Sequence, residues 1–166
     1  MNARRKKVLL ALIAGMTACV PALADDIVST IESKPLSELW LNPGFQTYHF
    51  QRNKGFNSNN YGLGVEYRFN TVASLTAGRF YNSDRDWSNY AGVYYQPFAI
   101  GPVRLGAVVG GFNGYPAMHD GGWFLAAIPV ISAEYGRVGA NVAIIPSYKD
   151  RLHGGISLQL KLKVFD

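Results

Sequence analysis

The chain has 166 residues, nearly half of them apolar, and a formal net charge of +5 at pH 7. Four of its 16 Lys and Arg residues precede residue 8, so residues 25–166 carry 12 basic and 11 acidic side chains, a charge of 12 − 11 = +1. This near-neutral balance excludes the basic surface that nucleic-acid binding requires.

Residues 1–24 have the pattern of a cleaved secretion signal. A basic start over residues 4–7 is followed by an apolar run over residues 8–16 and by the small-x-small site Ala22-Leu23-Ala24. The apolar run is too short to cross a bilayer as a helix. The only cysteine, Cys19, lies in this segment and ends a stretch that loosely resembles a lipoprotein processing site, which is the weaker alternative. The mature chain is therefore expected to contain no disulfide.

Residues 25–41 are predicted to form a short amphipathic helix at the membrane surface. Ile27 and Ile31 fall on one helical face, and Leu36 and Trp40 fall on another. Trp40 is expected to anchor this helix at the interface between lipid and water. The alternative is a tether whose apolar residues are incidental.

Residues 42–166 are predicted to form an all-β fold, an eight-stranded antiparallel up-and-down transmembrane β-barrel. In residues 61–69, apolar side chains at odd positions alternate with glycines and charged side chains at even positions, which is the pattern of a strand between lipid and a polar lumen. Connections alternate between short turns and long polar loops, as in barrels of the bacterial outer membrane. Eight strands leave no room for a wide pore. The expected strands are residues 45–52, 60–70, 73–81, 88–98, 103–112, 123–135, 138–146 and 154–165.

The last predicted strand contains one irregularity. Apolar side chains occupy the even positions from Ile156 to Val164, whereas the closing aromatic Phe165 falls on the same face as Lys161 and Lys163. Either a β-bulge or a departure of the chain from the strand at its last turn would explain this shift of one residue.

Polar side chains with catalytic potential gather at the predicted outer rim of the barrel. From periodicity alone, a histidine at such a rim is more often a solvated loop residue than a catalyst. The spacing contains no metal-ligand motif and no phosphate-binding glycine loop, so we expect neither a metal nor an organic cofactor. The rim candidates are His49, Asn82, Ser83, Asp84, Asp86, His119, Asp120, Asp150 and His153.

Three segments resemble the lipid A palmitoyltransferase (PagP) family, whose members are eight-stranded outer-membrane barrels with an N-terminal amphipathic helix. Thr47-Tyr48-His49 resembles the Thr-Trp-His of the family. Phe80-Tyr81-Asn82-Ser83, with Trp87 and Ala91-Gly92 following at the same spacing, resembles its Phe-Lys-Asp-Ser stretch. Residues 128–136 and the later Ile145-Pro146 resemble its paired-proline hairpin.

The resemblance implies catalytic roles for residues of the rim. His49 would act as general base on the accepting hydroxyl, and Ser83 would bind the developing oxyanion or the reacting ester. Asn82 stands where the family usually has Asp, and it would orient His49 without supplying a negative charge. Asp84 is the substitute that would supply this charge.

The resemblance also implies where the substrate binds. Pro129 and Pro146 cannot donate to the β-ladder and would flank a lateral opening in the wall, although proline is also tolerated at strand ends and bulges. Tyr94 stands where the family has the glycine at the floor of its acyl pocket, and it would shorten the cavity. The glycines expected to open the interior for the acyl chain are Gly62, Gly64 and Gly92.

The implied activity is transfer of a fatty acyl chain, palmitoyl in the family, from a glycerophospholipid to lipid A. The expected location is the outer membrane of a Gram-negative bacterium, the expected partners are these lipids, lipopolysaccharide and the bilayer, and the expected state is a monomer. Two alternatives stay open. A non-catalytic structural or adhesion barrel would have a polar lumen whose charges pair, for example Glu66 with Arg68 or Arg79 with Glu134. A lipid A deacylase would use the same rim residues to remove a chain.

Overall fold

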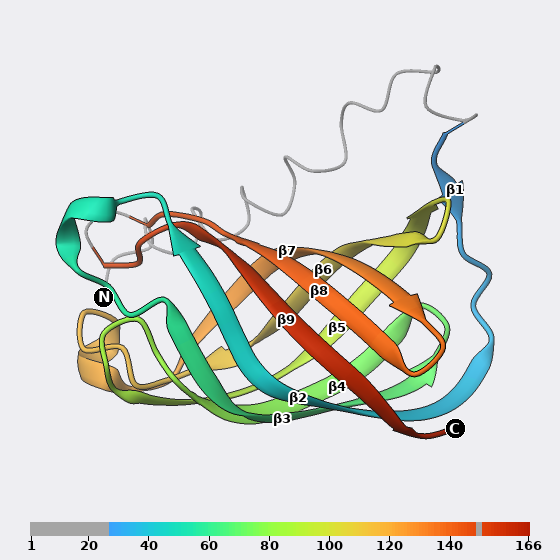
Figure 1. The fold of residues 1–166 in the computed structure, drawn as a ribbon, viewed down its shortest axis with the longest axis horizontal. Helices are drawn as coiled ribbons and strands as arrows, with labels where there is room; N and C mark the ends of the chain where they lie inside the picture. The colour runs from blue at the N-terminus through green and yellow to red at the C-terminus, as the bar shows by residue number, and fades with distance from the viewer. Residues whose placement is uncertain (1–26, 149–150) are drawn as a thin grey trace, which may run out of the picture.

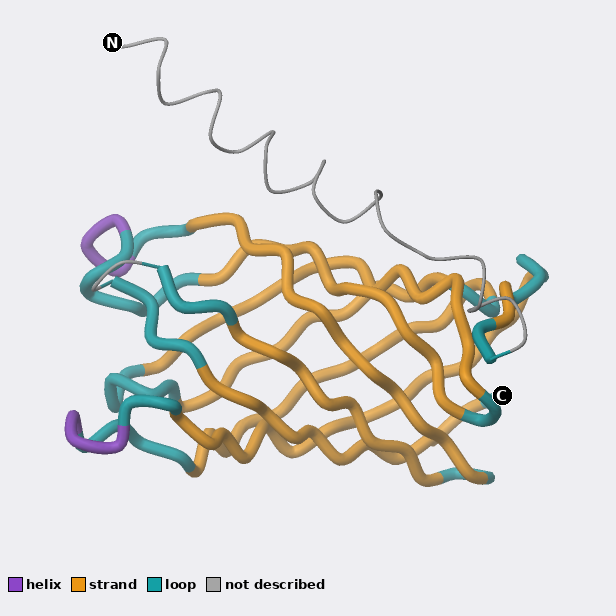
Figure 2. Tube along the Cα trace, turned by 90° about the horizontal axis from the view of Figure 1, so that it is seen from above, coloured by secondary structure: helices purple, strands orange, loops and turns teal. Residues whose placement is uncertain are grey.

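The computed structural model describes residues 27–148 and 151–166. Each of its eight long strands pairs antiparallel with the next, and the last pairs with the first, so that the sheet closes into a barrel (Figure 2). No helix among the described residues is long and apolar enough to cross a membrane. The barrel strands are β2 (Pro35–His49), β3 (Asn59–Asn70), β4 (Ala73–Tyr81), β5 (Trp87–Ile100), β6 (Val103–Phe112), β7 (Phe124–Tyr135), β8 (Val138–Ile145) and β9 (Gly155–Phe165).

The two ends of the barrel differ. The turns after β3, β5 and β7 are short, whereas the loops after β2, β4, β6 and β8 are long. The long loops gather at the left of Figure 1, and the short turns, the C-terminus and the small strand β1 (Ser29–Thr30) lie at the right. Two single-turn 3-10 helices, η2 (Arg52–Lys54) and η3 (His119–Gly121), lie in the long loops. This asymmetry confirms the predicted up-and-down topology, with its strands in the predicted order.

The first strand begins ten residues earlier than the sequence predicted, and the helix predicted over residues 25–41 is wrong for the described part of that range. Residues 29–30 pair with β5, and Pro35 begins β2. Glu38 lies opposite Arg68 of β3 and Trp40 opposite Glu66. Pairing with β2 gives the backbone of β3 its hydrogen-bond partners along this edge. A helix at the membrane surface would leave this edge of β3 unpaired. Residues 25–26 lie outside the described part.

Trp40 lies inside the barrel, which corrects its predicted role as an interfacial anchor. Its side chain is only 1% exposed. Its indole nitrogen donates to Glu38, and the ammonium groups of Lys161 and Lys163 lie 4.8 and 5.7 Å from the ring centre. These cation–π contacts are favourable in a site removed from water.

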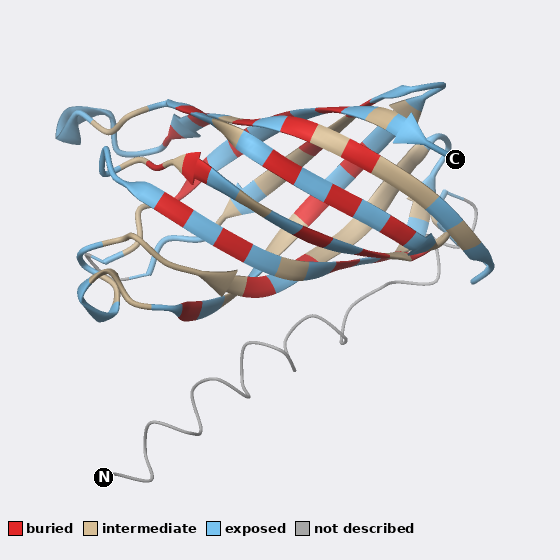
Figure 3. Cartoon of the chain, turned by 90° about the horizontal axis from the view of Figure 1, so that it is seen from below, coloured by how far each residue is buried: buried red, intermediate tan, exposed pale blue. Residues whose placement is uncertain are grey.

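Buried and exposed residues alternate along the strands, as the stripes of Figure 3 show. In β9, the even-numbered side chains from Ile156 to Val164 face outward, whereas Ser157, Gln159 and Lys161 are buried in the lumen. An apolar outer face around a polar interior is the arrangement of a transmembrane β-barrel. The pattern read from residues 61–69 is thus confirmed in three dimensions.

The irregularity at the C-terminus is a β-bulge. Leu39 pairs with Phe165 and Trp40 pairs with Lys163, so Val164 is an extra residue on β9. Because of this shift, Val164 and Phe165 are both exposed on the outside. Of the two explanations that the sequence left open, the structure therefore shows the bulge.

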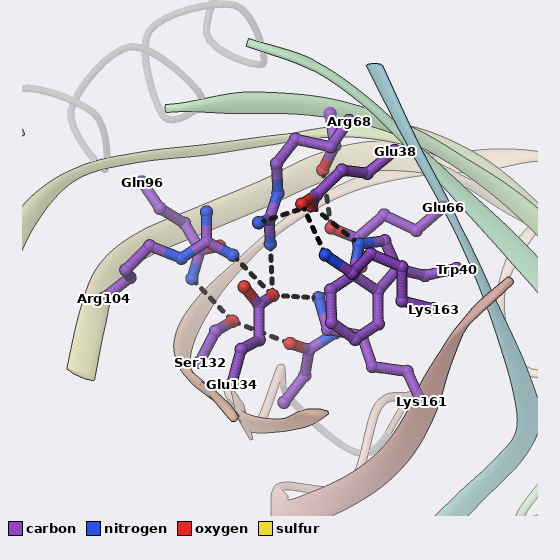
Figure 4. Close-up of polar contacts among 12 residues, drawn as sticks. Glu38, Trp40, Glu66, Arg68, Gln96, Arg104, Ser132, Glu134, Lys161 and Lys163 are labelled. Atoms are coloured by element: carbon purple, nitrogen blue, oxygen red, sulfur yellow. Dashed lines mark hydrogen bonds and ion pairs between the residues drawn. The ribbon is translucent and has the colours of Figure 1, made fainter. Parts of the chain in front are cut away.

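The half of the lumen near the short turns is filled by an ionic network (Figure 4). Glu134 accepts from Arg68, Arg104 and Lys161, and Lys161 also binds Glu66 at 2.9 Å. Mutual pairing of inward charges, expected for a structural barrel, is therefore present in this half.

The partners of two charged residues differ from the predicted ones. Arg68 binds Glu38 and Glu134 rather than Glu66. Arg79 faces outward over the ring of Trp87 rather than inward toward Glu134. Strand register decides both outcomes, because a residue's face and its cross-barrel neighbours depend on the pairing of all eight strands.

Candidate active site

The half of the lumen near the long loops contains an apolar cavity, here called the inner chamber. Its volume is about 90 Å³, and it is lined mainly by aromatic and aliphatic side chains from all around the barrel. Tyr94 closes it toward the ionic network, packing against Val108 and Val130. Two residues further along β5, Gln96 binds Ser132 in a chain of buried amides and hydroxyls. The chamber is lined by Phe45, Thr47, Asn60, Thr76, Phe80, Ser83, Tyr90, Tyr94, Val108, Phe112, Tyr115, Phe124, Ala126, Ile128, Ala143, Ile145, Leu152 and Ser157.

The three glycines expected to open the interior do not line this chamber. A side chain at Gly64 would collide with the hydroxyl of Tyr90, and one at Gly62 would collide with Phe80. A side chain at Gly92 would meet the backbone of β6. These glycines therefore allow large inward side chains and neighbouring strands to approach closely.

His49 and Ser83 meet at the mouth of the inner chamber. His49 is the last residue of β2, and Ser83 lies in the loop that follows β4. The Nε2 atom of His49 and the Oγ atom of Ser83 are hydrogen-bonded at 2.8 Å. The resemblance grouped these two residues, and the structure places their side chains in direct contact.

Asn82 does not touch His49, contrary to the role suggested for it. Its side-chain nitrogen donates to Ser88 Oγ at 2.9 Å and to the carbonyl of Gly114 at 2.6 Å. Its side-chain oxygen accepts from the backbone nitrogens of Asp84 and Asp86. Asn82 is fully buried, and these contacts fix the loop that carries Ser83.

Asn57 connects this loop to the loop that follows β2. Its backbone nitrogen donates to the carbonyl of Ser83 at 2.9 Å, and its side chain donates to the carbonyl of Asn82. The two loops that carry the His49–Ser83 pair are thus joined by hydrogen bonds. No sequence motif indicated a role for Asn57.

A second, more polar cavity lies on the other side of Ser83 and is here called the outer chamber. Its volume is about 30 Å³. Four of its lining residues also line the inner chamber, whereas His49 lines only the outer one. A group bound at Ser83 could therefore extend into both chambers. The outer chamber is lined by His49, Phe56, Ser83, Asp84, Tyr115, Ile145, Arg151, Leu152 and His153.

Phe56 separates two imidazole rings in the outer chamber. Its ring centre lies 5.2 Å from that of His49 and 4.5 Å from that of His153. Asp84 and His153 both interact electrostatically with His49. Asp84 is therefore placed to influence His49 by charge, as its substitute role requires, although no hydrogen bond joins the two within the described residues.

Tyr115 contributes a phenol to both chambers from the loop after β6. Burial raises the pKa of Tyr115, and the negative charge of Asp84 raises this pKa further. The hydroxyl therefore stays protonated and able to donate a hydrogen bond. Sequence reasoning missed Tyr115 and Phe56, because a single aromatic residue in a polar loop gives no local signal of function.

The ladder between β7 and β8 is interrupted beside the inner chamber. The ladder begins at the pair Tyr135 and Val138, and its last pair is Val130 and Ala143. Beyond this point, residues 124–129 pair with β6, and residues 144–145 pair with β9. Pro129 lies at the edge of the interruption, and Pro146 directly follows β8.

Side chains on both sides of this interruption line the inner chamber. Ala126 and Ile128 come from β7, and Ala143 and Ile145 come from β8. The end of this ladder thus lies beside the chamber, and Pro129 and Pro146 lie next to it. Whether a lipid chain enters there stays a prediction.

The remaining rim candidates do not join the site. His119 and Asp120 are exposed in η3 and line neither chamber. Asp86 caps the backbone of Trp87, and Asp150 lies outside the described residues. Among residues 27–148 and 151–166, no three His, Cys, Asp or Glu side chains gather where they could hold a metal ion.

The site can perform proton transfer at a point where an apolar and a polar chamber meet. An imidazole in contact with a hydroxyl can accept a proton from it or from a hydroxyl bound beside it. A scan against models of protein families and a search of curated proteins found no match to this chain.

Proposed function

We propose that this protein is an acyltransferase of the outer membrane that moves a fatty acyl chain from a glycerophospholipid to lipid A. The observation that carries the proposal is the His49–Ser83 hydrogen bond of 2.8 Å at the junction of the two chambers. The inner chamber suits a hydrocarbon chain, and the outer chamber suits polar groups. The substrate class itself comes from the resemblance to the lipid A palmitoyltransferase family.

In the proposed mechanism, His49 removes the proton from the accepting hydroxyl of lipid A. The resulting oxygen attacks the carbonyl carbon of the phospholipid ester, and Ser83 donates a hydrogen bond to the carbonyl oxygen as charge develops there. The bond between this carbon and the glycerol oxygen then breaks. The leaving oxygen takes the proton back from His49, which releases a lysophospholipid.

The acyl chain is held by the inner chamber and enters through the interruption between β7 and β8. Removing each methylene group from water contributes about 0.8 kcal/mol, so the chain itself can supply much of the binding energy. Palmitoyl is the chain expected from the family, and Tyr94 at the floor sets the depth that is available. The protein acts as a monomer in the bilayer that holds both lipids.

The inner chamber supports an enzyme over a purely structural barrel, since a structural barrel gains nothing from an apolar cavity beside a His–Ser pair. The deacylase alternative shares this pair and differs in its product. If water occupied the place of the accepting hydroxyl, the same steps would remove a chain.

The test is mass spectrometry of lipid A from a Gram-negative strain that expresses the wild type, His49→Ala or Ser83→Ala. We expect a mass gain of one acyl chain in the wild type and a loss of transfer by about 10²- to 10⁴-fold in His49→Ala, the range for a general base. His119→Ala is the matched control and should transfer normally. A mass loss in the wild type would favour the deacylase, and no change in mass would favour the structural barrel.

A further inference from the structure

The outer chamber is lined by a cation, Arg151, that pairs with no acidic side chain among residues 27–148 and 151–166. Arg151 lines the chamber from the loop after β8. Arg151 is exposed, whereas the buried cations of the ionic network pair with carboxylates. A guanidinium without a carboxylate in a polar cavity is suited to an anionic ligand.

His153 supplies a second nitrogen-containing side chain that can bind a ligand. It lines the same chamber, and its Nδ1 atom is buried without a hydrogen-bond partner among residues 27–148 and 151–166. Phe56 stacks on its ring and holds it apart from His49. Among the described residues, Asp84 is the carboxylate that lines the chamber. It will repel an anion, and so it directs an anion toward the side of Arg151 and His153.

Substrate geometry places a phosphate at this position. In a glycerophospholipid, the phosphate is attached to the same three-carbon glycerol as the ester, so it lies a few bonds from the carbonyl carbon. If that carbonyl lies at Ser83 with its chain in the inner chamber, the glycerol and its phosphate must occupy the outer chamber. The phosphate groups of lipid A would enter the same chamber with the accepting sugar.

We propose that the outer chamber is a phosphate-binding subsite in which Arg151 and His153 hold the phosphate of a lipid substrate. This inference rests on the proposed function. The phosphate can belong to the phosphodiester of the donor or to the phosphomonoester of the acceptor. Both present anionic non-bridging oxygens, two in the diester and three in the monoester, that can accept hydrogen bonds from a guanidinium and an imidazole.

The kinetic experiment measures selectivity ratios of the purified barrel in mixed micelles. One arm compares phosphatidylethanolamine with diacylglycerol of the same chains as donors, and the other compares lipid A with its dephosphorylated form as acceptors. In Arg151→Gln and His153→Gln, we expect the kcat/KM ratio of phosphorylated to unphosphorylated lipid to fall about tenfold or more in one arm. The arm that responds identifies the source of the phosphate.

The matched control is Arg52→Gln, because Arg52 is also a rim arginine but binds the hydroxyl of Tyr48 outside both chambers. Its ratios should equal those of the wild type. Ratios that stay unchanged in Arg151→Gln and His153→Gln, or that fall equally in Arg52→Gln, would overturn the subsite.

A binding experiment separates failure of this inference from failure of the proposed function. Dodecyl phosphate and dodecyl maltoside are titrated onto the amphipol-bound barrel, and the imidazole NMR signals of His153 are followed. We expect dodecyl phosphate to shift these signals and to bind more weakly to Arg151→Gln. The wild type could transfer no chain and still bind dodecyl phosphate in the way that depends on Arg151. This result would refute the proposed function but support the phosphate-binding subsite. Equal binding of both detergents to the wild type and to Arg151→Gln would refute the subsite.

Discussion

Asn82 fixes the loop that carries Ser83 of the proposed catalytic pair without contacting His49. Two hydrogen bonds from its amide nitrogen and two to its amide oxygen connect strand β4, the start of β5 and the loop after β6. Its nitrogen must donate to the carbonyl of Gly114, which a carboxylate cannot do. The residue that the family usually has here would therefore not fit the surroundings found in this chain.

We predict that Asn82→Asp lowers both stability and activity, although it restores the residue typical of the family. The carboxylate would lie against the Gly114 carbonyl and would lose one buried hydrogen bond, at a cost of about 1–3 kcal/mol. Urea unfolding and the acyl-transfer assay measure the two effects. Asp84→Asn serves as the comparison, because it removes the charge near His49 and leaves the loop contacts of Asn82 intact. Higher activity in Asn82→Asp would show that a charge at position 82 is the missing element.

Tyr94 determines the depth of the inner chamber. It is buried against Val108 and Val130 at the boundary with the polar half of the lumen. We predict that Tyr94→Ala shifts the transferred chains toward greater length by several carbons, as measured by mass spectrometry of lipid A. Tyr95→Ala, on the outer face of the same strand, should leave the chain length unchanged.

The shortened side chain at position 94 has a cost in stability. Removing a buried aromatic ring leaves a cavity, for which a loss of about 3–5 kcal/mol of unfolding free energy is typical. Tyr94→Leu keeps more of the packing and should give a smaller shift in chain length. An unchanged length distribution in both variants would mean that another residue forms the floor.

At the scale of elements, the ladder between β7 and β8 stops before the ends of both strands at the side of the long loops. Their ladder ends at the pair Val130 and Ala143, and continued pairing would place Ile128 opposite Ile145. Pro129 cannot donate a backbone hydrogen bond, so the local sequence itself opposes continuation. The ladder between β2 and β9 also contains a break, between Leu41 and Gln46 of β2, but it resumes and continues to His49.

We predict that a disulfide across this interruption blocks entry of the acyl chain. The double variant Ile128→Cys and Ile145→Cys should lose transfer when oxidised and regain it when reduced. The control pair is Ile131→Cys and Val142→Cys, which lie opposite each other within the intact ladder. Full activity of the oxidised first pair, with the disulfide verified by mass, would place the entry route elsewhere.

At the scale of the whole molecule, the lumen is divided into an ionic half and an apolar half. All eight barrel strands contribute polar side chains to the first half, which closes the barrel near the short turns (Figure 4). Lys161 is central, since it is 3% exposed and binds both Glu66 and Glu134. Strands far apart in the sequence are thereby joined across the interior.

We predict that Lys161→Met destabilises the barrel by about 3–5 kcal/mol, because it leaves two buried carboxylates short of a partner. Urea-induced unfolding in lipid vesicles measures this change. Lys34→Met is the matched control, since its ion pair with Glu32 is exposed and such pairs contribute about 0–1 kcal/mol. Equal stability of the two variants would show that the network is not needed for folding.

The sequence by itself determined the number of barrel strands, most of their boundaries and, in the strands with clear alternation, which side chains face outward. The alternation of residues 61–69 and of β9 is a local property with a period of two, and it survives whatever the strands pair with. The sequence also showed that Phe165 breaks this period, but only the pairing with β2 identified a bulge as the cause.

Only the tertiary structure decided which residues meet. Leu36 and Trp40 fit a helical face in the sequence, but the unpaired edge of β3 and the charges of the lumen draw this segment into β2. Nothing between positions 49 and 83 indicates that these two side chains lie 2.8 Å apart, or that Asn82 faces away from them. Such contacts depend on the closure of all eight strands, because the register around the whole cylinder fixes which loops are neighbours.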